Sequence, residues 1–228
     1  MKKIISTVEL NITILTDKKS YMNDYNFILS DKLKQLGHDV RLINSKDELT
    51  NGDIAFFFSV FELVSEDKLK LNRNNIIIHE SDLPAGKGWS PASWQIIEGV
   101  DRIVLTAFEA ISTVDSGDIY FKEAILLDGT ELAEQWRRKI ALKKIEMCLR
   151  LVENYPQLKP VPQQGKESFY RKRTMYDSKL NPNKTIAEQF NLLRIVDNDL
   201  YPAFFFHNGK KYLLKIYTDD NEPTVCID

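Results

Sequence analysis

Cysteine, histidine and long apolar runs are all scarce in this chain of 228 residues. The two cysteines, Cys148 and Cys226, follow neither a metal-binding spacing nor a disulfide framework, so we expect no metal site. The longest apolar run, residues 54–64, is about half as long as a bilayer-spanning helix and contains Ser59 and Glu62. These shortages exclude disulfide-rich, metal-clustered and membrane-spanning proteins.

An excess of one charge sign is also missing. Lys and Arg number 31 and Asp and Glu number 33, which gives a formal net charge of −2. Proteins that bind nucleic acids or membrane surfaces usually carry a broad basic stripe, so we expect neither partner. The first residues are soon followed by polar and charged ones rather than by a secretory apolar segment, and we expect a cytoplasmic protein.

The chain does contain enough apolar residues for a large core, with 43% hydrophobic and 11% aromatic residues. Short apolar segments predict strands at residues 11–16, 40–43, 54–58, 76–78, 102–108 and 119–127. Helical patterns stand between several of them, at residues 25–36, 65–71 and 93–98. This alternation with short links predicts an α/β fold with a mostly parallel sheet covered on both faces.

Two amphipathic helices are expected to cover the sheet. The first precedes Gly37, and its apolar side chains are Phe27, Ile28, Leu29, Leu33 and Leu36. The second opens after residues 128–131, where Asp128 or Thr130 is expected to cap it, and continues to residue 152.

The last third of the chain has a different pattern. Residues 155–165 contain three prolines and predict a linker, and residues 166–184 carry six basic side chains against two acidic ones. A short helix is expected at residues 185–196, and Asn208-Gly209 between two apolar segments predicts a β-hairpin. The predicted organisation is therefore an α/β domain, residues 1–155, followed by a linker and a small α+β subdomain, residues 156–228.

Candidate functional residues follow two of the predicted strands. His79 stands where a buried strand ends, and ligands of open parallel sheets bind beyond the carboxyl ends of strands. Asp115, in a loop between two later strands, is a candidate partner that orients the imidazole or exchanges a proton with it. Each residue alone is more often structural, so these residues by themselves predict only a candidate site.

Three short motifs follow one another in this region: His-x-Ser-x-Leu-Pro at 79–84, Gly-Trp-Ser-Pro at 88–91 and Asp-x-Gly at 115–117. Together they resemble the formyltransferases that use 10-formyltetrahydrofolate. That family includes methionyl-tRNA formyltransferase, glycinamide ribonucleotide formyltransferase and the nucleotide-sugar N-formyltransferases. The resemblance covers roughly residues 52–152 and implies a Rossmann-like formyltransferase domain with 10-formyltetrahydrofolate as the co-substrate.

The resemblance also implies roles for individual residues. His79 would stabilise the oxyanion of the tetrahedral intermediate, and Asp115 would hold His79 and help to remove the amine proton. The folate would be held by Phe61, Leu63, Val64, Ala110, Val114 and Gly117.

One position departs from the family pattern. The family has an Asn two residues before the His, and this chain has Ile77 there, which cannot donate to an oxyanion. Asn75 lies about 13 Å from His79 along a strand, so Ser81 or a backbone N–H is the expected replacement. Because one oxyanion donor contributes on the order of 100- to 1000-fold, an impaired formyltransferase-like binding module is an alternative function.

The C-terminal segment resembles the part of sugar N-formyltransferases that completes the acceptor site. An amino sugar, expected to be nucleotide-linked, would then be the acceptor. Its binding residues would be Lys87, Gly88, Trp89, Ser90, Arg171, Arg173 and Arg194. Few residues follow the linker, so we expect no tRNA-binding domain. The C-terminal segment disfavours the remaining alternative, a purine-pathway formyltransferase. The aromatic hairpin offers an edge for a homodimer.

Overall fold

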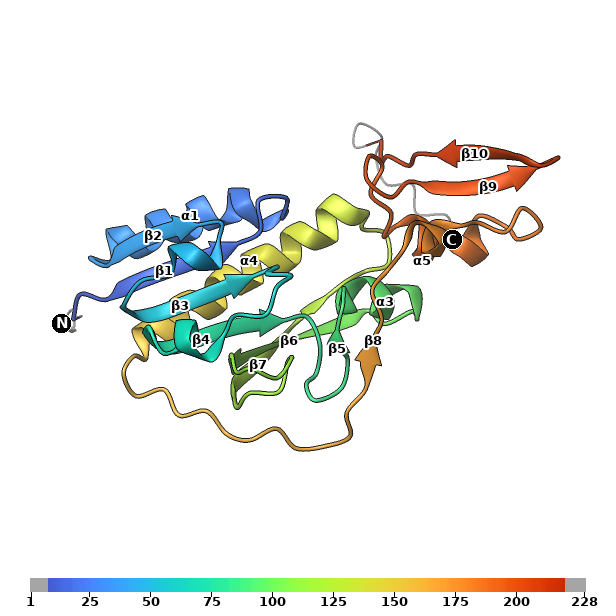
Figure 1. The fold of residues 1–228 in the computed structure, drawn as a ribbon. Helices are drawn as coiled ribbons and strands as arrows, with labels where there is room; N and C mark the ends of the chain where they lie inside the picture. Colours follow the sequence, from blue (N-terminus) through green and yellow to red (C-terminus); the bar gives the residue numbers. More distant parts are fainter. Residues whose placement is uncertain (1–7, 220–228) are drawn as a thin grey trace.

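A six-stranded sheet with the strand order β2-β1-β3-β4-β6-β7 forms the centre of the computed structural model, which describes residues 8–219 (Figure 1). Its strands are β1 (Asn11–Thr16), β2 (Asp39–Ile43), β3 (Gly52–Phe58), β4 (Asn72–His79), β6 (Arg102–Glu109) and β7 (Ile119–Leu126). Strands β2, β1, β3 and β4 pair in parallel, and β6 and β7 continue the sheet in antiparallel pairs. The predicted mostly parallel sheet is confirmed.

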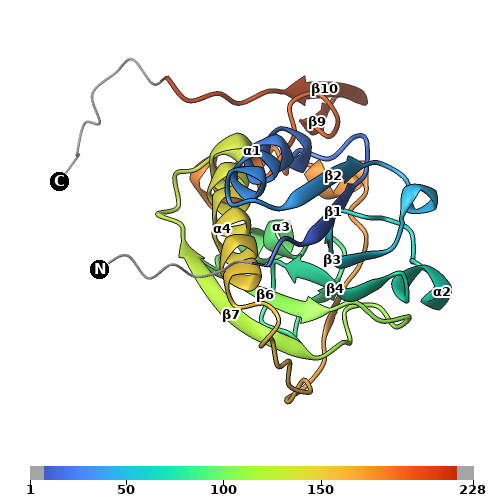
Figure 2. The ribbon, with the colours of Figure 1, turned by 90° about the vertical axis from the view of Figure 1, so that its left-hand side faces the viewer.

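The two long helices, α1 (Met22–Gln35) and α4 (Ala133–Glu153), pack together on one face of the sheet (Figure 2). The other face is covered by the short helix α2 (Glu66–Leu69), by loops and by a smaller apolar cluster around Ala55 and Phe57. Both faces are covered, as expected, but the long helices do not flank the sheet. The remaining helical segments are η1 (Lys46–Glu48), α3 (Pro91–Ile97), η2 (Met175–Ser178), η3 (Ala187–Gln189) and α5 (Phe190–Leu193).

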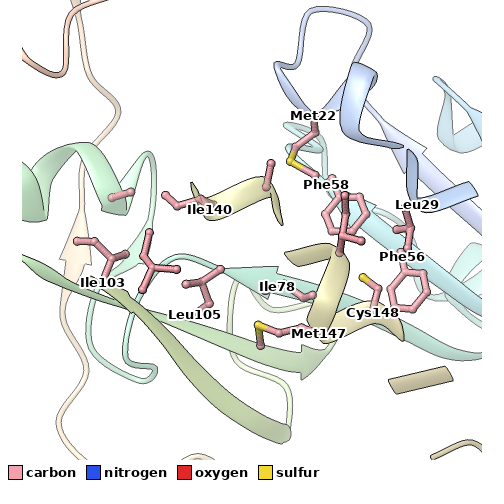
Figure 3. Packing of buried hydrophobic residues seen from close by; sticks show 14 of the residues in the cluster. Met22, Leu29, Phe56, Phe58, Ile78, Ile103, Leu105, Ile140, Met147 and Cys148 are labelled. Atoms are coloured by element: carbon pink, nitrogen blue, oxygen red, sulfur yellow. The ribbon is translucent and has the colours of Figure 1, made fainter. Parts of the chain in front are cut away.

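The main core lies between the sheet and this helix pair. Figure 3 shows Leu29 of α1, Phe56 of β3 and Cys148 of α4 within it, and all three are fully buried. Burial also raises the pKa of the Cys148 thiol, because the thiolate would lose its hydration. This packing holds the carboxyl ends of β3 and β4 rigidly, and the candidate site lies there.

The predicted apolar face of the first helix is only partly correct. Leu29 and Leu33 are buried, but Phe27, Ile28 and Leu36 are exposed. The buried stripe of α1 follows three- and four-residue steps and consists of Met22, Asn26, Leu29, Ser30 and Leu33. A polar residue occupies this stripe because the Asn26 side chain donates a hydrogen bond to the Thr16 hydroxyl at the end of β1.

The expected caps of the second helix are wrong. Helix α4 begins at Ala133, after the caps proposed from the sequence, and its first turn is closed by Gln135, whose side chain accepts the N–H of Leu132. Asp128 accepts the N–H of Thr130 and closes a separate turn before the helix. Glu131 is buried and binds side chains of other elements, so it has a tertiary role.

The C-terminal segment leaves α4, crosses the molecule in an extended linker and returns beside the loop that follows β4 (Figure 1). There β8 (Phe169–Tyr170) pairs in parallel with β5 (Lys87–Gly88). Strands β9 (Ala203–His207) and β10 (Lys210–Leu214) form the predicted hairpin, with positive φ values of 46° at Asn208 and 77° at Gly209, as a type I′ turn requires. The helix expected at 185–196 is shorter, because η3 and α5 together span only residues 187–193.

Candidate active site

A cavity of about 860 Å³ opens beyond the carboxyl ends of β3 and β4. Its walls come from residues 59–64, 77–80, 88–93 and 110–115, from α4, and from residues 172–174 and 197–201 of the C-terminal segment. The volume lies within the usual range for small-molecule sites. Segments distant in sequence therefore meet at one cavity.

His79 and Asp115 lie together at this cavity, as predicted. The His79 Nε2 atom is 3.8 Å from the Asp115 carboxylate, and the side chains are only 9% and 11% exposed. Nε2 is also 2.9 Å from the carbonyl oxygen of Gly86, which can only accept, so Nε2 carries a hydrogen. The Asp115 carboxylate in turn accepts the N–H of Gly88 at 2.8 Å. The imidazole is thus oriented by one carbonyl and one carboxylate.

The loop that carries Asp115 is fixed by the linker. Asp115 has a φ of 48°, and its carbonyl accepts a hydrogen bond from the Gln163 side chain at 2.9 Å. The same amide donates to the carbonyl of Gly117 at 2.8 Å. A Cβ at Gly117 would lie 1.7 Å from the Glu109 carbonyl oxygen, so only glycine fits. Gly117 does not line the cavity, and its place in the structure is this turn rather than the predicted folate contact.

The other predicted folate residues form an apolar wall. Phe61, Leu63, Val64, Ala110 and Val114 all line the cavity. Phe61 is 57% exposed, and its ring stacks on that of Trp89 with centroids 5.5 Å apart. We call this set of five residues the apolar wall. It suits a planar, largely apolar group, because such a group loses unfavourable contact with water there.

Ile77 also lines the cavity, so no side-chain donor stands where the family has its Asn. Asn75 does not replace it, because its side chain donates to the carbonyl of Leu69 at 2.8 Å. The proposed replacement Ser81 is wrong as a cavity residue: it is 2% exposed, and no hydrogen bond engages its hydroxyl within residues 8–219. Its side chain packs closely against Gly86, where an added Cβ would lie 2.9 Å from the Ser81 Cβ, and its backbone carbonyl accepts from Thr106.

Four of the predicted acceptor residues line the cavity: Gly88, Trp89, Ser90 and Arg173. The predictions for the other three are wrong, because each cation is neutralised elsewhere. Lys87 is buried and binds Ser116 and Glu167. Arg194 is 2% exposed and pairs with Glu131 at 3.0 Å. Arg171 lies outside the cavity and binds both carboxylate oxygens of Asp177.

Arg173 differs from these three cations. Its guanidinium lies in the cavity wall, and no carboxylate pairs with it in the part of the chain that the structure describes. Burial is the main cause that lowers the pKa of Arg173; the charge of Asp177 opposes this shift, and the charge of Arg137 adds to it. A half-buried cation beside a second cation favours an anionic ligand, which would restore the lost solvation.

Two further cations belong to the same wall, and sequence reasoning missed one of them, Arg137. Lys172 lies 4.6 Å above the Trp89 ring, and Arg137 of α4 pairs with Asp197 at 3.1 Å. Lys172 lay within the basic run noted in the sequence, whereas Arg137 is one of many charged residues on a long helix. We call Arg137, Lys172 and Arg173 the cationic wall, which faces the cavity from α4 and the C-terminal segment.

A buried ion pair beside His79 was missed as well. Glu80 follows His79 directly, and its carboxylate lies 2.5 Å from the Lys144 ammonium of α4. Burial alone would raise the pKa of Glu80, but the charges of Lys144 and His79 outweigh it and lower that pKa, so the carboxylate stays ionised. The available signal was a lysine on the apolar side of a predicted amphipathic helix.

Other kinds of site are not apparent. Residues 8–219 contain no group of three or more His, Cys, Asp or Glu side chains suited to a metal ion. None of the described helices combines the length and apolar character needed to cross a bilayer.

Solved structures of other proteins share this fold. HypX from Aquifex aeolicus in complex with tetrahydrofolic acid matches with a TM-score of 0.79 and 19% identity, covering 92% of this chain and 38% of that chain. A 4-N formyltransferase from Francisella tularensis matches with a TM-score of 0.70 and 17% identity, covering 90% and 97%.

Proteins that resemble this chain in sequence are also formyltransferases. The chain is 28% identical over 174 residues to the methionyl-tRNA formyltransferase of Lachnospira eligens. The aligned stretch covers 75% of this chain and 54% of the relative. No family model matches the chain. The chain thus spans about half the length of this curated relative. The resemblance predicted from the motifs is confirmed, since formyltransferases stand among both the relatives and the structural neighbours.

Proposed function

We propose that the protein is an N-formyltransferase that moves the formyl group of 10-formyltetrahydrofolate to the amine of a nucleotide-linked amino sugar. The observation that carries the proposal is the position of His79 and Asp115, which lie between the apolar wall and the cationic wall of one cavity. Two chemically different substrates meeting at an acid–base pair require such an arrangement.

The apolar wall supports the folate part of the proposal. A pterin ring is planar, and Val114, Ala110 and the exposed ring of Phe61 offer it apolar contacts. The structural neighbour HypX was solved with tetrahydrofolic acid, which is the product of formyl transfer from this co-substrate.

The chemistry follows from the His–Asp pair. The acceptor nitrogen forms a bond to the formyl carbon, and the carbonyl oxygen gains negative charge. His79 would turn its Nε2–H from the Gly86 carbonyl to that oxygen, and this donation lowers the energy of the intermediate. The bond between the carbon and N10 then breaks, Asp115 takes the proton that the amine loses, and N10 accepts a proton in turn.

The cationic wall supports an acceptor with phosphate groups. Arginine binds phosphate oxygens with two parallel hydrogen bonds, and the Arg173 guanidinium forms no ion pair among the described residues, although the charge of Asp177 acts on it. The ammonium of Lys172, in the same wall, lies over the Trp89 ring. Another structural neighbour is a sugar N-formyltransferase from Shewanella, which supports an amino-sugar acceptor.

The curated relative favours a second acceptor, methionyl-tRNA. The test therefore offers the protein 10-formyltetrahydrofolate with nucleoside-diphosphate amino sugars that carry the amine on different carbons, and with methionyl-tRNA in a parallel reaction. We expect a formylated sugar detected by mass spectrometry, and its loss in Asp115→Asn. Product from methionyl-tRNA alone would reject the sugar acceptor, and folate binding without any product would support a binding module.

A further inference from the structure

We propose that Glu80 and Lys144 recognise a hydroxyl group of the acceptor next to its reacting amine, and so select a sugar. This inference rests on the proposed function, and it gives a role to the part of the cavity that the formyl-transfer chemistry does not use. Glu80 and Lys144 both line the cavity that contains His79.

The position of the pair places it on the acceptor side. Side chains alternate along a strand, so Ile77 and His79 of β4 face one side and Ile78 and Glu80 face the other. Ile77 packs with the cluster on the side of the apolar wall, whereas Ile78 lies in the main core beside α4 (Figure 3). Glu80 therefore faces α4, opposite the wall assigned to folate.

The chemistry of the pair matches a neutral hydroxyl. Lys144 is the only side chain that donates to the Glu80 carboxylate within residues 8–219, and Glu80 is 18% exposed. The ionised carboxylate accepts hydrogen bonds, and the ammonium retains N–H groups that donate. A hydroxyl donates one hydrogen and accepts another, so it can bind both members without adding a net charge.

Two aromatic residues complete this part of the cavity. Tyr21 and Trp136 both line it, and the guanidinium of Arg137 lies 5.7 Å and 5.4 Å from their rings. Aromatic faces suit the apolar C–H surface of a sugar ring while polar groups bind its rim. The cationic residue Arg137 also connects this region to the cationic wall, where the phosphates of the same acceptor would lie.

The energetic consequence is a strong preference for the hydroxylated acceptor. A site built to hydrogen-bond a hydroxyl disfavours the analogue that lacks it, because the hydrogen-bonding positions that Glu80 and Lys144 do not use for each other lose water without a replacement. Glu80 and Lys144 are 18% and 3% exposed, so water reaches them poorly once the cavity is filled.

The experiment measures binding rather than turnover, with tetrahydrofolate present. Its probes are dTDP-glucose and UDP-glucose with their 3-deoxy and 4-deoxy counterparts, which carry no amine. For the wild type we expect one deoxy counterpart to bind on the order of 30-fold more weakly by calorimetry. In Glu80→Gln we expect this ratio to fall to about 3-fold or less, with the affinity for tetrahydrofolate unchanged.

A matched control is Glu62→Gln, which neutralises another carboxylate of the cavity that pairs with Lys46. It should keep the wild-type ratio. If Glu80→Gln does not fold, Glu80→Asp takes its place in the experiment. The shorter side chain retains the charge but moves it away from the hydroxyl, so this variant should also lower the ratio.

Three results would overturn the inference: no discrimination by the wild type, an unchanged ratio in the Glu80 variants, or no binding of any of these sugars. Because no formyl transfer is measured, a failure of the proposed reaction shows itself separately, as missing product on the amino-sugar panel.

Discussion

The two walls of the cavity differ in chemistry and in how the chain holds them. The apolar wall follows β3 and β6 within short loops, and three of its side chains, Phe61, Leu63 and Val114, are exposed. The cationic wall combines α4 with a segment that returns from beyond the linker and is tied to the sheet region by the pairing of β5 and β8. One wall thus depends on local sequence and the other on long-range contacts.

This difference teaches that the two substrates should be separable by mutation. An apolar wall binds by removing surface from water, whereas a cationic wall binds by charge. Changes on one wall should therefore alter one Michaelis constant and leave the other unchanged, and a change between the walls should affect turnover with both substrates.

The largest effect is expected for His79→Ala, between the walls. Loss of an oxyanion donor should reduce turnover by roughly 100-fold or more, while folate still binds on the apolar wall. Tetrahydrofolate formation and a folate titration measure the two quantities. Unchanged turnover would remove His79 from the mechanism.

Arg173→Met tests the cationic wall alone. A hydrogen bond to a charged group contributes about 1.5–3 kcal/mol, so the KM for the acceptor should rise roughly 10- to 100-fold while the KM for folate stays constant. Arg171→Met is the matched control, because Arg171 pairs with Asp177 outside the cavity. Equal effects of both substitutions would contradict a specific anion site.

Val114→Asp tests the apolar wall in the same way. Val114 is 46% exposed, so the protein should still fold, but the new carboxylate would be desolvated by a bound folate. We expect the KM for folate to rise roughly 10-fold with little change in the KM for the acceptor. Leu126→Asp, at an exposed position of β7 outside the cavity, should leave both constants unchanged.

The smallest effect concerns the stability of the segment that carries Arg173. A hydrogen bond from Arg171, followed by hydrogen bonds from Thr174, holds the pKa of the Asp177 carboxyl well below its usual range. Because this pKa is lower in the folded state than in the unfolded state, the ionised Asp177 stabilises the fold fully at pH values above its unfolded-state pKa of about 4. This contribution is lost as the pH falls through the lower folded-state pKa.

Asp177→Asn should therefore lower the urea midpoint slightly at pH 7, and the difference from the wild type should narrow as the pH is reduced below about 4. A difference that is independent of pH would mean that packing, rather than charge, is responsible.

Much of the architecture could be predicted from local patterns. The strand segments, the hairpin at Asn208 and the mostly parallel sheet follow from apolar runs and turn residues, which act over a few positions. His79 and Asp115 were found because the motifs around them have a defined order, and the structure places them 3.8 Å apart. The exposed face of α1 was misjudged because Asn26, a polar residue, is buried against Thr16.

The charged residues show what could not be predicted. Lys87, Arg171 and Arg194 look as available in the sequence as Arg173 does, and each is neutralised by a carboxylate from another position. Ser81 belongs to the motif but is buried against Gly86, and the Glu80–Lys144 pair joins residues 64 positions apart.

The sequence by itself determined the strands and helices, the hairpin and the pair of candidate catalytic residues, because periodicity, turn propensity and motif spacing are properties of neighbouring residues. Only the tertiary structure decided which cations remain free to meet a ligand and which polar groups face the cavity. The physical reason is that burial and ion pairing depend on which distant segment lies alongside, and a charge changes its role once an opposite charge is within hydrogen-bond distance.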